Sequence, residues 1–110
     1  MRGKFELKKS GGQFMWTLKA SNGKVILTSE RYKSKKSAEN GIASVRQNAR
    51  RAASFDRRKA KNGKPYFAMI ATNRQVIGMS QMYAASSSME NGIKSVKTFA
   101  GKADVNDLTK

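Results

Sequence analysis

The sequence predicts an α+β fold in two layers: two tandem βββα(β) repeats that form one largely antiparallel sheet, with both helices packed on one face. Three observations lead to this prediction. The chain repeats itself at an offset of about fifty residues. In each copy, segments of alternating apolar and polar residues precede a segment of helical spacing. At 110 residues, the chain is long enough for one modest domain.

The repeat consists of two copies of the same series of residues. In each copy a serine is followed by a Glu-Asn-Gly-Ile stretch and a Ser-Val pair, at identical spacing. The positions are Ser37, Glu39, Asn40, Gly41, Ile42, Ser44 and Val45 in the first copy, and Ser88, Glu90, Asn91, Gly92, Ile93, Ser95 and Val96 in the second. We therefore expect one domain over residues 1–110, with repeats at about 1–52 and 53–110 that share one hydrophobic core.

In the first repeat we expect three strands and then a helix. The strands span residues 5–9, 14–20 and 25–30, where apolar and polar or β-branched side chains alternate. Asn22-Gly23 predicts a tight hairpin turn, because both residues accept a positive φ. The helix is predicted from apolar residues at helical spacing, namely Ala38, Ile42, Val45 and Ala49.

The second repeat keeps this order. Its expected strands span residues 55–61, 66–71 and 76–81, and its helical stripe is Met89, Ile93, Val96 and Ala100. Arg74 stands where the first repeat has Gly23, so a different turn type is expected there. A last short strand is expected around Val105.

The doubled Gly-Ile-x-Ser-Val helix, with Tyr32 and Tyr83 before its two copies, resembles the YegP-like family of small bacterial tandem-repeat proteins. The resemblance covers nearly the whole chain. It implies that the final strands are exchanged between the units, with residues 55–61 as a shared strand and the Val105 segment as its mate. The function of that family is uncharacterised, so the resemblance supplies no catalytic residues. Pro65 departs from the family pattern, because an aromatic residue is expected there.

The residues that most enzymes use are missing from the composition. The sequence has no histidine and no cysteine, which excludes Ser-His-Asp and Cys-His catalysis and the common transition-metal ligands. No glycine-rich phosphate loop is present either. We therefore expect a non-enzyme with no catalytic residues, no cofactor and no metal. Since no long apolar run or export signal is visible, we also expect no membrane contact and a cytoplasmic location.

Positive charge is the strongest compositional signal. The chain carries 23 Lys and Arg against 7 Asp and Glu, a formal net charge of +16. Such a balance favours an acidic protein or a nucleic acid as partner. The densest stretch straddles the junction of the repeats, and its candidate nucleic-acid-binding residues are Arg46, Arg50, Arg51, Arg57, Arg58, Lys59, Lys61 and Lys64.

The sheet face opposite the helices is a second candidate surface. Its candidate contact residues are Met15, Lys19, Tyr66 and Ile70, a less polar set than a solvated face usually carries. This face could bind a partner, complete a dimer or stack single-stranded bases; alternatively, long lysine side chains cover it. The chain is expected to be a monomer or a weak dimer.

Two functions remain open from the sequence. The first is a small, basic, non-enzymatic module that acts in protein interaction or in a structural or stress-associated role. The alternative is non-specific nucleic-acid binding through the basic cluster between Arg46 and Lys64 and the open sheet face.

Overall fold

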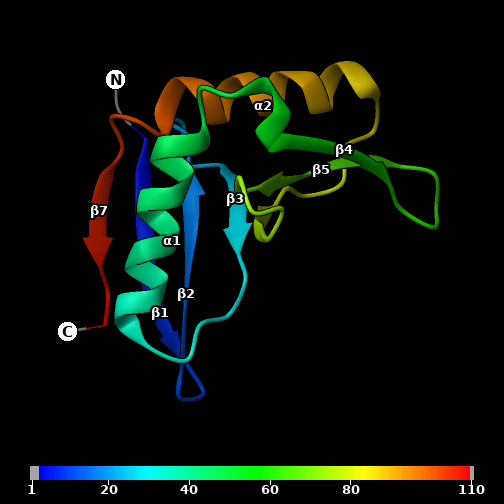
Figure 1. The fold of residues 1–110 in the computed structure, drawn as a ribbon. Helices are drawn as coiled ribbons and strands as arrows, with labels where there is room; N and C mark the ends of the chain where they lie inside the picture. Colours follow the sequence, from blue (N-terminus) through cyan, green and yellow to red (C-terminus); the bar gives the residue numbers. More distant parts are fainter. Residues whose placement is uncertain (1–2, 110) are drawn as a thin grey trace.

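A computed structural model describes residues 3–109 of the chain as a seven-stranded sheet and two long helices (Figure 1). In chain order the elements are β1 (Lys4–Ser10), β2 (Gln13–Lys19), β3 (Val25–Ser29), α1 (Lys35–Asn48), the short 3-10 helix η1 (Ala52–Ser54), β4 (Phe55–Lys59), β5 (Pro65–Ile70), β6 (Val76–Met79), α2 (Ser86–Phe99) and β7 (Asp104–Asp107). The expected strands and helices are therefore present, with boundaries shifted by a few residues.

The two repeats join into a single sheet of order β4-β5-β6-β3-β2-β1-β7. They meet where β3 pairs antiparallel with β6, and all other pairs are antiparallel except β1 with β7, which is parallel. The predicted fold class is confirmed. The expectation that the Val105 segment is the mate of residues 55–61 is wrong, because β7 and β4 lie at opposite ends of the sheet (Figure 1). The reason is that the chain after α2 returns to the edge of the first repeat.

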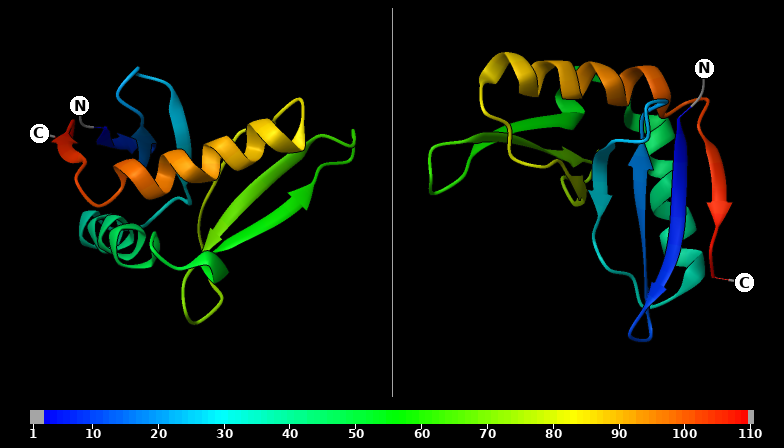
Figure 2. Two further views of the ribbon diagram at one scale, coloured as in Figure 1. Left: turned by 90° about the horizontal axis from the view of Figure 1, so that it is seen from above. Right: turned by 180° about the vertical axis from the view of Figure 1, so that it is seen from behind.

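Both helices pack on one face of this sheet. Leu18 of β2 lies opposite Leu27 of β3, so these two side chains point to the same side. Ser29, two residues after Leu27, points to that side as well. It lies opposite Gly78 of β6, which in turn lies opposite Met69 of β5, so Met69 also points to this side. That side also buries the apolar stripes of α1 and α2 in one hydrophobic cluster drawn from both repeats. The rotated views in Figure 2 show the two helices crossing each other over the twisted strands.

Three hairpins share one kind of turn, in which a type I turn is followed by a left-handed residue. In the first, the Gly23 N–H donates to the Ala20 carbonyl at 2.9 Å, and Asn22 Oδ1 accepts the Lys24 N–H at 3.0 Å. Among the described non-glycine residues only Arg74 has a positive φ, so Gly23 is left-handed and Asn22 is not, unlike our expectation. The expectation of a different turn at Arg74 is also wrong, because Arg74 adopts the left-handed conformation itself, with φ 69°.

Gly41 lies in the middle of α1 because the Tyr32 ring packs directly against the helix there. A Cβ at position 41 would overlap the Tyr32 hydroxyl and lie 3.0 Å from the Trp16 indole nitrogen. We expect Gly41→Ala to lower the free energy of unfolding by about 1–2 kcal/mol, although alanine is the better helix former. The measurement is urea unfolding. Removal of the oxygen by Tyr32→Phe should recover about half of the loss, and an unchanged loss would contradict the proposed clash.

An ion pair between the start of α1 and β7 stabilises the position of β7. Lys35 Nζ lies 2.5 Å from Asp107 Oδ2, and the ammonium group, with the Thr109 hydroxyl and N–H, holds the pKa of Asp107 well below its usual range. The contribution to stability is therefore complete above about pH 4, the pKa of an unfolded aspartate, and is lost as the pH falls further. We expect the amide protection of β7 to decline in acid faster than that of β2. Asp107→Asn should remove this extra pH dependence, and equal decline in both strands would contradict it.

Candidate interaction surface

The basic strand β4 sends alternate side chains to the two faces of the sheet. Phe55 and Arg57 lie opposite Met69 and Phe67, so they point toward the helices. Asp56 and Arg58 point to the open face. One strand therefore presents positive charge on both sides at the edge of the molecule.

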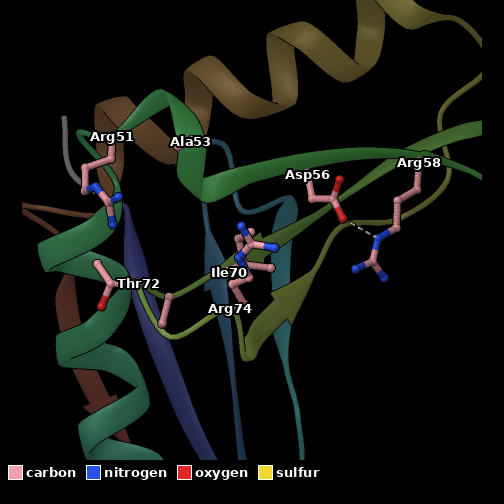
Figure 3. A pocket seen from close by; sticks show the side chains of 8 residues that line it. Arg51, Ala53, Asp56, Arg58, Ile70, Thr72 and Arg74 are labelled. Atoms are coloured by element: carbon pink, nitrogen blue, oxygen red, sulfur yellow. Dashed lines mark hydrogen bonds and ion pairs between the residues drawn. The ribbon is translucent and has the colours of Figure 1, made fainter.

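On the open face, three arginines from three separate segments surround one hollow, which we name the arginine pocket (Figure 3). Arg51 follows α1, Arg58 lies on β4, and Arg74 lies in the turn before β6. The pocket has a volume of about 570 Å³, and its lining residues are Arg51, Ala53, Asp56, Arg58, Ile70, Ala71, Thr72 and Arg74. The lining carries three arginines and one carboxylate, which is Asp56 paired with Arg58, so its net charge is positive and the pocket favours anions.

Backbone strain marks Arg74 as unusual within this pocket. The equivalent turn positions in the other two hairpins are Gly23 and Gly63, both with positive φ. A residue with a Cβ pays about 1–2 kcal/mol to adopt this conformation. Strain of this kind tends to be kept at functional positions. Arg74 was not among the site residues predicted from the sequence. An arginine at a turn position where the other repeat has glycine could have indicated it.

A second hollow lies beside β4 near the start of α2, and we name it the edge pocket. Its volume is about 320 Å³, and its lining residues are Arg57, Arg58, Lys59, Pro65, Ser86, Met89 and Glu90. The N-terminus of α2 opens toward it without a side-chain cap, because the N-cap residue is Ala85, whereas Ser34 caps α1 by accepting the Ser37 N–H at 3.1 Å. Uncapped N–H groups of a helix attract an anion.

Ion pairs to local carboxylates engage both β4 arginines. Arg57 Nη2 donates to Glu90 Oε1 at 2.7 Å, and this contact raises the pKa of Arg57 and lowers that of Glu90. Arg58 Nε donates to Asp56 Oδ2 at 2.8 Å, which raises the pKa of Arg58. All four side chains are partly exposed, so a stronger anionic partner can compete for the arginines.

The structure divides the predicted basic cluster among separate places. Arg51 and Arg58 meet at the arginine pocket, and Arg57 and Lys59 line the edge pocket. The others lie apart: Arg46 donates from Nη2 to the Ala103 carbonyl at 2.5 Å, Arg50 is exposed beyond the end of α1, and Lys61 and Lys64 lie at the tip of the β4–β5 hairpin.

The predicted sheet-face residues also separate into two groups. Tyr66 lies opposite Arg58, and Ile70 lines the arginine pocket. Met15 and Lys19 lie on β2, in the half of the sheet that the first repeat forms. There Lys19 Nζ pairs with Glu6 Oε1 at 2.8 Å, and this contact is the main cause of the lowered pKa of Glu6. The face near Lys19 is thus covered by lysine, while the face near Tyr66 borders the candidate site.

Residues 3–109 contain neither a metal site nor a membrane-spanning helix. Among these residues, no group of three or more Asp and Glu side chains is placed to hold a metal ion. No helix in this part of the chain is both long enough and apolar enough to cross a membrane.

Two basic hollows on a duplicated α+β scaffold define a small tandem-repeat protein with a candidate anion-binding surface. The pattern of the domain of unknown function DUF1508 matches the chain twice, over residues 10–56 and 60–107. The chain therefore belongs to this family, which confirms the resemblance read from the doubled helix motif.

Relatives across bacteria share both sequence and fold with this chain. It is 53% identical over 110 residues to the UPF0339 protein YegP of Escherichia coli K12, covering 99% of this chain and all of YegP. It is 52% identical over 109 residues to a UPF0339 protein of Bordetella pertussis, covering 99% and 98% of the two chains. The solution NMR structure of E. coli YegP, a protein of unknown function, matches with a TM-score of 0.94 at 53% identity, covering 99% of this chain and 95% of the other. The solution NMR structure of a UPF0339 protein of Shewanella oneidensis gives 0.93 at 49% identity, covering 99% and 93%.

The names of these relatives assign no reaction and no ligand. The family is uncharacterised.

Proposed function

We propose that this protein is a non-enzymatic interaction module that binds acidic segments of other proteins through the arginine pocket. The observation that carries the proposal is Arg74, which keeps a strained backbone at a position that lines the same pocket as Arg51 and Arg58. Arginine binds carboxylates through paired N–H groups, so three of them favour a partner with several acidic side chains. We propose further that the protein has a structural or stress-associated role. In the same proposal, it is cytoplasmic and is a monomer or a weak dimer.

The absence of histidine and cysteine from the sequence supports a non-enzymatic role. So does the state of the carboxylates near β4, since Asp56 and Glu90 are each ion-paired to an arginine. The contact with Arg57 lowers the pKa of Glu90, so this carboxylate is a weak base and a poor proton donor near neutral pH.

A second candidate function is binding of single-stranded nucleic acid without sequence specificity. The observation that favours it is the half-buried ring of Tyr66, which lies opposite Arg58 on the open face. An aromatic ring beside guanidinium groups can stack a base while the arginines contact phosphates. With three phosphate contacts, the logarithm of affinity should fall with the logarithm of salt concentration at a slope of about −2.

The test measures fluorescence anisotropy of a labelled glutamate-rich peptide and of a labelled single-stranded RNA of similar charge. The variant Arg58→Gln with Arg74→Gln should bind the peptide about tenfold more weakly, because it loses two charge-assisted contacts. The matched control, Lys61→Gln with Lys64→Gln, removes the same charge from the hairpin tip and should change affinity less than about threefold. Equal losses in both variants would contradict the pocket, and binding of RNA alone would favour the second function.

A further inference from the structure

Strands β1 and β4 occupy equivalent positions in the two repeats, but in the described part of the chain only β1 has a further strand on its outer side. Phe5 of β1 lies opposite Leu18, and Phe55 of β4 lies opposite Met69, which is the repeat counterpart of Leu18. Strand β4 is therefore the counterpart of β1. The outer edge of β1 is covered by β7, whereas no strand among residues 3–109 covers the outer edge of β4 (Figure 1). The fold thus contains one occupied and one open position for an outer strand.

The occupied position shows what kind of segment such an edge accepts. The segment β7 is acidic and lies parallel to β1. The Asp104 N–H donates to the Gly3 carbonyl at 3.3 Å, and the Leu108 N–H donates to the Leu7 carbonyl at 2.8 Å. The carboxylate of Asp107 reaches Lys35 in the first turn of α1. An acidic extended segment is therefore held by backbone hydrogen bonds and by one cation at a helix start.

The edge pocket lies at the equivalent place in the second repeat. Arg57 is the counterpart of Leu7, which lies opposite Asp107, and Ser86 is the counterpart of Lys35. Both line the edge pocket, so the hollow lies where the carboxylate of an outer strand would reach. The groups there suit a carboxylate, since Arg57 supplies the positive charge and the uncapped start of α2 supplies free N–H groups.

We propose that the outer edge of β4 binds an extended acidic segment of a partner protein as an added strand, parallel to β4. A carboxylate of that segment reaches Arg57 and the N-terminus of α2 in the edge pocket, as Asp107 reaches Lys35 in the first repeat. Neighbouring acidic side chains on the open face lie beside Arg58 and the arginine pocket. This inference rests on the proposed function and states how the acidic segment is held. In strand addition, backbone hydrogen bonds provide the affinity, and contacts of alternate side chains provide the specificity.

The chain contains a competitor for this position, because Glu90 already pairs with Arg57. Removal of its charge should leave Arg57 free for the incoming carboxylate. We expect Glu90→Gln to tighten binding of the acidic peptide about threefold. Glu39 is the counterpart of Glu90 in the first repeat and lies away from β4, so Glu39→Gln is the matched control and should leave the affinity unchanged.

The experiment uses the full-length protein and a labelled peptide with the sequence of residues 102–109, which carries the acidic pattern of β7. The protein's own β7 stays on β1, because attachment to the same chain gives it a far higher effective concentration. Leu7 offers its backbone to β7, so its counterpart Arg57 offers its backbone to the open edge. Arg57→Val removes only the side chain, whereas Arg57→Pro also removes the N–H and is tolerated at a strand edge.

The expected loss of affinity is about threefold for Arg57→Val and about tenfold or more for Arg57→Pro, since proline also removes a strand hydrogen bond. Bound peptide should slow hydrogen exchange of the Arg57 amide. Equal affinities of the two variants, or an unprotected Arg57 amide, would overturn strand addition. If such a peptide still binds and depends on Arg58 and Arg74, the proposed function stands without it. If no acidic peptide binds, both proposals are overturned. A dimer in sedimentation that Arg57→Pro abolishes would assign the edge to a second copy instead.

Discussion

A leucine at position 78 is expected to lower the free energy of unfolding by about 3 kcal/mol, because it would overfill the point where the two repeats meet. Gly78 is the repeat counterpart of Leu27. A Cβ at position 78 would lie 2.8 Å from the Thr28 carbonyl oxygen and 3.1 Å from Leu27 Cγ. Because Leu27 is fully buried, only one of the two equivalent positions can carry a large side chain. Urea unfolding measures the loss.

The reciprocal change distinguishes a shared core from two separate cores. Leu27→Gly alone should cost about 3 kcal/mol or more, since it leaves a cavity. In the double variant, the leucine at position 78 can fill the space left at position 27. The combined loss should then fall short of the sum of the single losses by more than about 1 kcal/mol. Additive losses would mean that the repeats do not share this space.

Replacement of Arg74 by glycine is expected to make the protein more stable and less able to bind. Glycine adopts the left-handed backbone without strain, so Arg74→Gly should raise the free energy of unfolding by about 1 kcal/mol. The same change removes one of three guanidinium groups from the arginine pocket. Affinity for the glutamate-rich peptide should fall about threefold, because one charge-assisted contact is lost. Thermal unfolding and fluorescence anisotropy measure the two effects.

The control for this variant is the reverse change in an equivalent turn. Gly23 has the same left-handed backbone as Arg74 but belongs to the first repeat. Gly23→Arg should therefore cost about 1 kcal/mol of stability without improving peptide binding. If Arg74→Gly lost stability, or gained it with no loss of binding, the link between strain and function at Arg74 would be contradicted.

Most of the fold could be predicted from the sequence because its elements carry strong local patterns. The helical stripe around Ile42 and Val45, and its copy around Ile93 and Val96, predict two amphipathic helices, and the strand patterns and the repeat predict that both pack on one side of a sheet. The position of β7 could not be predicted in this way. Its residues are mostly exposed and carry little apolar periodicity, so its place on β1 depends on hydrogen bonds and on the Lys35–Asp107 ion pair.

The candidate site was only partly predictable. Local charge density pointed to Arg51, Arg57 and Arg58, but the sheet sends the last two to opposite faces. Arg74 joins the pocket because a hairpin brings its turn beside β4, a contact between residues distant in the sequence. The role of the β4 edge also depends on topology, since a strand is recognised as an edge only when its neighbours are known.

Chemical-shift mapping of the isotope-labelled, full-length protein during titration with the glutamate-rich peptide tests whether acidic segments bind at the two pockets. The backbone amides that shift should lie around these pockets, at residues 51–59, 70–74 and 86–90. Shifts concentrated at the hairpin tip near Lys61 and Lys64, or spread evenly over all basic surfaces, would contradict such binding, because binding would then follow net charge rather than the site.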